Sequence, residues 1–105
     1  MPATNENFLN SLNQHNKRIH YLAKEYIKRI DDLYEQGKYK IYENKFVFSF
    51  ILDNQINDEE KIANEIETLR GYECVMMKSI LNDDEKTYTL TIFIEPKYFI
   101  PREEN

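Results

Sequence analysis

Residues 5–36 of this chain read NENFLNSLNQHNKRIHYLAKEYIKRIDDLYEQ, and this stretch decides the fold. Its apolar residues recur every three to four positions, which predicts one long amphipathic helix. Two rows share one face of that helix and form a seam at heptad spacing. One row holds Leu12, Ile19, Tyr26 and Leu33, and the other, three residues earlier, holds Leu9, Asn16, Ala23 and Ile30. Such a seam needs a sheet or a partner helix to cover it.

The predicted helix is long for a chain of 105 residues. A helix over residues 5–36 spans about 48 Å at about 1.5 Å per residue. A compact domain of about 100 residues has a radius of gyration of only about 13 Å. Either the helix projects from the body and contacts another subunit, or it breaks near residues 13–16, where Asn and His are poor helix formers. The sequence leaves both alternatives open.

The remainder of the chain predicts a strand-rich body around a second helix. In β(β)αββ order, the expected elements are a strand or hairpin at 38–53, a helix at 58–70 and strands at 72–81 and 86–95. Residues 1–105 then form a single domain: a long helix at 5–36, a body at 38–95 and a tail at 96–105. The predicted fold class is α+β, with an antiparallel or mixed sheet of three to four strands and the second helix on one face.

Several local patterns refine this expectation. Gly37 and Gly71 each follow a predicted helix and are typical of C-terminal caps. The pair Glu43-Asn44 predicts a turn, because Asn tolerates left-handed backbone. Residues 45–52 are apolar on both faces, which is typical of a central strand covered on both sides. The connection from this strand through the second helix predicts a crossover to a parallel neighbouring strand.

The charge balance restricts the partners. The chain carries 14 Lys and Arg against 19 Asp and Glu, a net charge of −5, which disfavours non-specific binding to nucleic acids and anionic membranes. Cys74 is the single cysteine, so no intrachain disulfide is possible and a reducing compartment is favoured. The N-terminus lacks the pattern of a secretory signal. We therefore expect a small acidic cytoplasmic protein, of a cell or of an infected host cell, with no membrane partner.

No constellation of residues predicts catalysis, a metal site or a cofactor. His15 and His20 are five positions apart, which separates them by about 140° around a helix, so they cannot share a metal ion. Because both glycines are assigned to helix caps, none is left for a phosphate-binding loop. We therefore expect a protein that is not an enzyme, without a cofactor or metal.

A basic stripe on the long helix supports one alternative function. Basic side chains alternate with an aromatic one at steps of four, three and four residues, a pattern that can follow a nucleic-acid backbone. The alternatives to a solvated helix face are therefore a small nucleic-acid-binding regulator and a docking site for an acidic partner. The candidate contacts of the regulator are Lys17, Tyr21, Lys24, Lys28 and Arg29.

The preferred hypothesis is a non-catalytic protein-interaction or inhibitor protein that forms a homodimer through its N-terminal helix. The composition, rich in Lys, Asn and Ile, fits an accessory protein of a phage, virus or mobile element. The competing explanation of the seam is that the helix only covers its own sheet. The candidate self-association residues are Leu12, Asn16, Ile19, Tyr26, Ile30 and Leu33.

Overall fold

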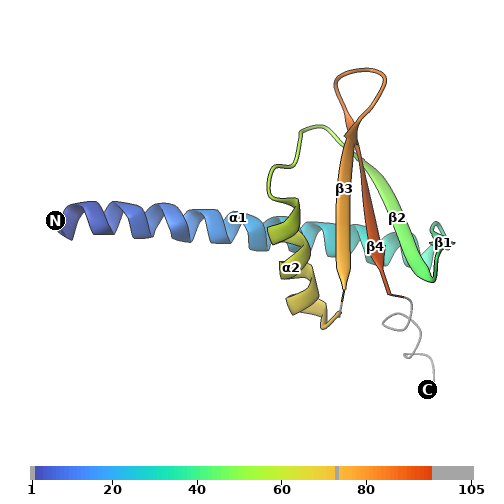
Figure 1. The fold of residues 1–105 in the computed structure, drawn as a ribbon, viewed down its shortest axis with the longest axis horizontal. Helices are drawn as coiled ribbons and strands as arrows, with labels where there is room; N and C mark the ends of the chain where they lie inside the picture. Colours follow the sequence, from blue (N-terminus) through green and yellow to red (C-terminus); the bar gives the residue numbers. More distant parts are fainter. Residues whose placement is uncertain (1, 73, 96–105) are drawn as a thin grey trace.

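The computed structural model describes residues 2–72 and 74–95, with side chains from Asn13 onward (Figure 1). Along the chain lie α1 (Pro2–Glu35), β1 (Lys40–Tyr42), β2 (Lys45–Leu52), α2 (Glu59–Arg70), β3 (Val75–Leu81) and β4 (Tyr88–Ile94). This order confirms the predicted α+β fold of a long N-terminal helix, a four-stranded sheet and a second helix. The predicted tail, 96–105, lies outside the described residues.

Helix α1 is continuous, so the alternative of a break near residues 13–16 is wrong. It ends where Gly37 adopts a left-handed conformation with φ of 72°. The Gly37 N–H donates to the Tyr34 carbonyl at 3.1 Å, and the Lys38 N–H donates to the Leu33 carbonyl at 2.8 Å. This pair of bonds is a Schellman motif, which satisfies carbonyls that the end of the helix leaves without partners.

The four strands form one antiparallel sheet in the order β1-β2-β4-β3. The predicted crossover between parallel neighbours is therefore wrong. Strands β2 and β3 do run parallel, but β4 lies between them and pairs with both, with Ile92 facing Phe48 on one side and Met77 on the other. The β3–β4 hairpin places β4 between β2 and β3 in the sheet. The apolar, inward-facing side chains of β4 are therefore flanked on both sides by those of β2 and β3.

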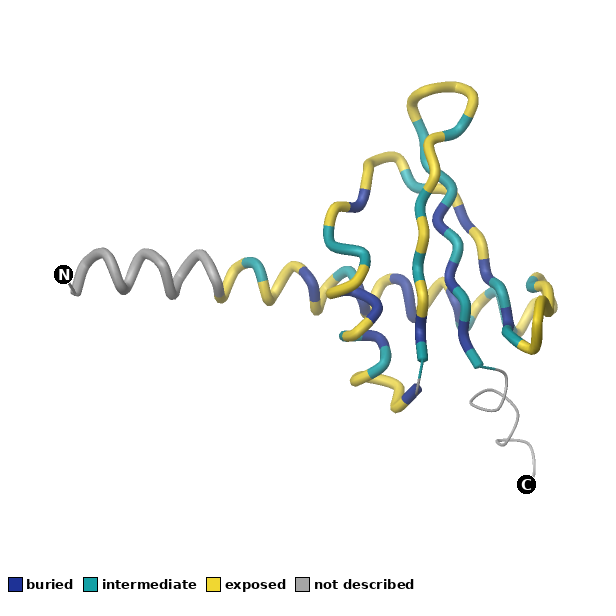
Figure 2. Tube along the Cα trace, in the orientation of Figure 1, coloured by how far each residue is buried: buried dark blue, intermediate teal, exposed yellow. Residues whose placement is uncertain are grey.

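Both helices cover the same face of this sheet, and α1 runs crosswise to the strands (Figure 1). Strand β4 alternates between the two faces, because Leu90, Ile92 and Ile94 are fully buried while Thr89, Thr91 and Phe93 are half-buried. Buried segments of α1, α2 and the strands meet in one core (Figure 2). Its members are Ile19, Ala23, Tyr26, Ile27, Ile30, Phe46, Phe48, Phe50, Ile56, Ile62, Ala63, Ile66, Tyr72, Val75, Leu90, Ile92 and Ile94.

Two local predictions are also confirmed. Glu43 and Asn44 have φ of 51° and 65°, the two positive values that a type I′ hairpin turn between β1 and β2 requires. Gly71 has φ of 72°, and its N–H donates to the Glu67 carbonyl at 2.7 Å, so it caps α2 as expected. Residue type at these positions therefore fixes where the elements end.

Candidate interaction surfaces

Only part of α1 lies on the body of the protein. The first turns, Pro2–Gln14, project past α2 and the sheet, and we call this part the overhang (Figure 1). Among the described side chains of α1, the first buried one is Ile19, with 7% of its surface exposed. The radius of gyration, 16.2 Å, exceeds the value of about 13 Å expected for a compact chain of this length. The helix is therefore longer than its own sheet can cover.

The second half of the predicted seam is occupied within the chain. Ile19, Tyr26 and Ile30 are buried in the core, and Leu33 packs half-buried against it. The Tyr26 ring lies 5.7 Å from that of Phe50, and burial raises the pKa of its hydroxyl, with the charge of Arg18 acting in the opposite direction. Ile19, Tyr26 and Ile30 have at most 7% of their surface exposed, so the competing explanation, that the helix covers its own sheet, accounts for these three residues.

The two remaining residues of the predicted set lie where α1 leaves the body. Asn16 is exposed and lines an open concavity of about 580 Å³ together with Ile19, His20 and Glu65. Leu12 belongs to the overhang, and its side chain lies outside the described ones. The part of the seam that a partner can reach therefore extends from Asn16 toward the N-terminus of α1.

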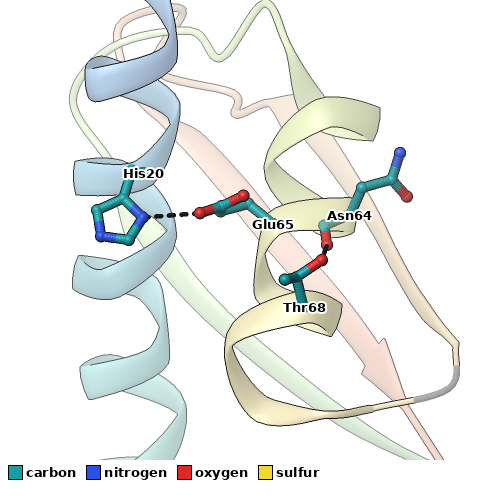
Figure 3. Close-up of polar contacts among 4 residues, drawn as sticks. All are labelled: His20, Asn64, Glu65 and Thr68. Atoms are coloured by element: carbon teal, nitrogen blue, oxygen red, sulfur yellow. Dashed lines mark hydrogen bonds and ion pairs between the residues drawn. The ribbon is translucent and has the colours of Figure 1, made fainter.

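Polar contacts hold α2 against α1 beside this concavity. His20 Nδ1 on α1 lies 2.7 Å from Glu65 Oε2 on α2 (Figure 3). About one turn after Glu65, the Thr68 hydroxyl donates to the Asn64 carbonyl within α2. Arg18 pairs with Asp58 at 3.4 Å, and Arg70 pairs with Asp31. Exposed pairs of this kind contribute little stability individually. Together they connect α2 to α1 at three points, from Arg18 near the overhang to Asp31 near the end of α1.

Within residues 2–72 and 74–95, no helix covers the second face of the sheet, and we call it the open face. It corrects the prediction that residues 45–52 are covered on both sides, because Ile51 is 53% exposed and its neighbours on the same face are half-buried or exposed. Apolar side chains of two adjoining strands continue this surface. The open face consists of Val47, Ser49 and Ile51 of β2, Met76, Lys78 and Ile80 of β3, and Thr89, Thr91 and Phe93 of β4.

The β3 edge of the sheet, in contrast, is partly closed to an additional strand. Along β3 the Val75 N–H donates to Glu67 Oε2 at 2.8 Å, and the Ser79 N–H donates to Glu59 Oε2 at 3.0 Å. Helix α2 thus occupies two of the backbone donors that a further strand would use. At the opposite edge β1 is only three residues long, and short edge strands are poor templates for pairing. The β3 edge is therefore less accessible to a partner strand than the open face is to a partner helix.

The basic stripe lies on the side of α1 that faces away from the core. Lys17, Tyr21, Lys24 and Lys28 are all exposed, Tyr21 at 61%. The fifth predicted residue, Arg29, is also exposed, but its guanidinium lies 4.5 Å from the centre of the Phe50 ring. The stripe is thus accessible, and Arg29 has a structural contact besides any role in binding.

Comparison with known proteins finds no matching family model, no similar curated protein and no similar solved structure. Within residues 2–72 and 74–95, no helix combines the length and apolarity needed to cross a membrane. The same part of the chain contains no group of three His, Cys, Asp or Glu residues placed to hold a metal ion. The candidate surfaces are the three described above: the overhang, the open face and the basic stripe.

Proposed function

We propose that this chain is a non-catalytic protein-interaction protein that self-associates through the overhang of α1. The observation that carries the proposal is that α1 continues past the body while its apolar pattern continues with it. In the sequence, Leu12 and Phe8 stand seven and eleven residues before the buried Ile19, spacings that keep positions on one helix face. An apolar helix face beyond the core gains stability when a partner covers it.

The chain's composition supports a finer proposal, that it acts as a cytoplasmic accessory or inhibitor protein whose working unit is a homodimer. An accessory protein of a phage, virus or mobile element acts by binding a protein partner, and the acidic charge of the chain favours a basic one.

Sedimentation velocity at tens of micromolar protein tests the self-association. The wild type is expected to be a dimer, whereas Leu12→Asp is expected to be monomeric, because it places a charge on the seam. Gln14→Asp is the matched control: it adds the same charge two residues away, on the exposed side of the helix, and is expected to dimerise like the wild type. A strictly monomeric wild type would contradict the proposal.

A second candidate function is nucleic-acid binding through the basic stripe. It is favoured by the exposure of Lys17, Tyr21, Lys24 and Lys28 on one side of α1, and opposed by the net charge of −5. A gel-shift assay at low salt, where electrostatic binding is strongest, tests it. If this function is real, single-stranded RNA or DNA is retarded by the wild type and not by Lys24→Glu/Lys28→Glu. If the wild type retards neither probe, nucleic-acid binding by the basic stripe is excluded.

A further inference from the structure

We infer that the open face of one protomer receives the overhang of a second protomer, and that the exchange is reciprocal. The inference rests on the proposed self-association and adds the surface that the overhang contacts. It pairs two features that the described part of one chain leaves uncovered: a helix longer than its sheet and a sheet with helices on only one face.

The length of the overhang suits this role. Residues 19–33 of α1 span about 22 Å and cross the chain's own sheet, whose outer strands are about 14 Å apart at the usual strand spacing. The overhang, Pro2–Gln14, spans about 20 Å. It therefore has the length to cross a second sheet in the way that the following half of the same helix crosses the first.

The direction of the seam suits it as well. The buried side chains of α1 face the chain's own sheet, and Leu12 and Phe8 continue that row of helix positions in the sequence. A second protomer that covers this side of the overhang contacts it with its own open face. That open face must point in the direction opposite to the open face of the first protomer. A two-fold axis produces this arrangement, and it simultaneously places the second overhang on the first open face.

The open face has the composition of a helix-packing surface. Cross-strand neighbours form two rows rich in apolar side chains, Val47–Phe93–Met76 and Ile51–Thr89–Ile80, with Ser49–Thr91–Lys78 between them. Met76, Ile80 and Ile51 are 53%, 58% and 53% exposed. Most of these side chains are aliphatic, which favours burial against a protein helix over stacking on nucleobases.

The charges are also complementary. Residues 2–16 contain one acidic residue, Glu6, and neither Lys nor Arg. The outward strand positions carry Lys40, Lys45 and Lys78, and opposite Lys45 the chain continues to Glu95. A weakly acidic helix therefore meets a locally basic face of an otherwise acidic protein, which favours this contact over one between two acidic surfaces.

Reciprocal exchange also accounts for a sequence pattern that the single chain leaves unexplained. Strand β2 is apolar on both faces, although α1 and α2 cover only one. In the proposed dimer each sheet lies between its own α1 and the overhang of its partner. Both faces of β2 are then covered, as its composition predicts.

The test measures self-association of two full-length variants, separately and mixed, by sedimentation velocity. Ile80→Asp alters the open face only, and Leu12→Asp alters the overhang only. Each variant alone loses both reciprocal contacts, so each dissociation constant is expected to rise by about 100-fold or more. Tyr21→Asp is the control for Ile80→Asp, since Tyr21 is equally exposed but lies on the outer side of α1. It is expected to dimerise like the wild type, and circular dichroism confirms that all three variants fold.

The equimolar mixture of Ile80→Asp and Leu12→Asp gives the decisive result. The first variant retains a normal overhang and the second a normal open face, so the mixed dimer keeps one intact contact. We expect it to form at concentrations where both variants alone are monomeric. A mixture that stays monomeric overturns the inference. Wild-type dimerisation of Ile80→Asp overturns it too, but leaves self-association through the overhang standing, whereas a monomeric wild type removes both.

Discussion

The two faces of the sheet are built from alternate residues of the same strands, yet they have opposite environments. On the covered face Phe48 and Ile92 have no exposed surface, whereas on the open face Ile51 and Ile80 expose more than half of theirs. Both faces contain large aliphatic side chains. The difference shows that apolar content in a strand does not determine which face is buried, because burial depends on where the helices lie.

The largest expected contrast between the faces is in stability. Phe48→Ala should lower the free energy of unfolding by about 3–5 kcal/mol, because it removes a fully buried ring and leaves a cavity. Ile80→Ala should change it by less than about 0.5 kcal/mol in dilute protein, where no partner covers the open face. Urea denaturation followed by circular dichroism measures both. Equal losses would show that the open face is covered within a single chain.

The next prediction concerns the β3 edge of the sheet, where the covered face and the open face meet. Glu67→Ala should lower the free energy of unfolding by about 1–2 kcal/mol, because the Val75 N–H loses a charged acceptor at 2.8 Å. Amide exchange at Val75 should accelerate at the same time. Glu60→Ala is the control, a neighbouring exposed carboxylate on α2. Unchanged exchange at Val75 in Glu67→Ala would mean that the rest of α2 protects this edge without the carboxylate.

A smaller effect is expected at the rim of the covered face. Arg29→Ala should lower the free energy of unfolding by about 0.5–1 kcal/mol, since its guanidinium lies over the Phe50 ring. Lys28→Ala, one residue earlier and also exposed, should have almost no effect. Thermal unfolding of the two variants side by side gives the comparison. If both lose the same amount, the loss comes from helix propensity and not from the ring contact.

The smallest effect is expected in the turn that joins β3 and β4, which belongs to neither face. The Asp84 carboxylate accepts hydrogen bonds from the Lys86 N–H at 2.8 Å, the Thr87 N–H at 2.9 Å and the Thr87 hydroxyl at 2.8 Å. These bonds, in that order of importance, hold the pKa of Asp84 below its ordinary value. Its contribution to stability is therefore present above the pKa of the unfolded chain and is lost as the pH falls through the lower, folded pKa.

Carboxyl-carbon NMR measures that titration directly. Asp84 should titrate below the ordinary Asp pKa of about 3.9, and the stability of Asp84→Asn should depend less on pH in this range than that of the wild type. Asp83→Asn serves as the neighbouring control. An ordinary titration midpoint for Asp84 would show that the turn does not hold its carboxylate in solution.

Helix ends and turns could be predicted because single residues decide them. Gly37, Gly71 and the pair Glu43-Asn44 occupy the positive-φ positions that their spacing predicts. The extent of α1 follows equally from its apolar period. The order of the strands could not be predicted. The central position of β4 depends on its pairing with both β2 and β3, and the pairing with β2 joins segments that are distant in the sequence.

The candidate site could be predicted in part. The spacing identified the seam of α1, but not the point at which it leaves the core, because that depends on the width of a sheet built elsewhere in the chain. Ile19, Tyr26 and Ile30, which the seam predicts to contact a partner, lie in the core. No local sequence pattern predicts that Glu59 and Glu67 bind the backbone of β3. Glu67 binds a residue eight positions later and Glu59 binds one 20 positions later, so the two contacts share no common spacing.

The carboxylates along β3 also bear on how this protein behaves when it begins to unfold. Strand β2, KFVFSFIL, has one charged residue, Lys45, followed by an uncharged, β-favouring run of the kind that assembles into fibrils once it is unpaired. As long as α2 stays docked, growth by addition at the β3 edge is hindered. Detachment of this one short helix would therefore expose the β3 edge to strand addition even while the sheet is still intact.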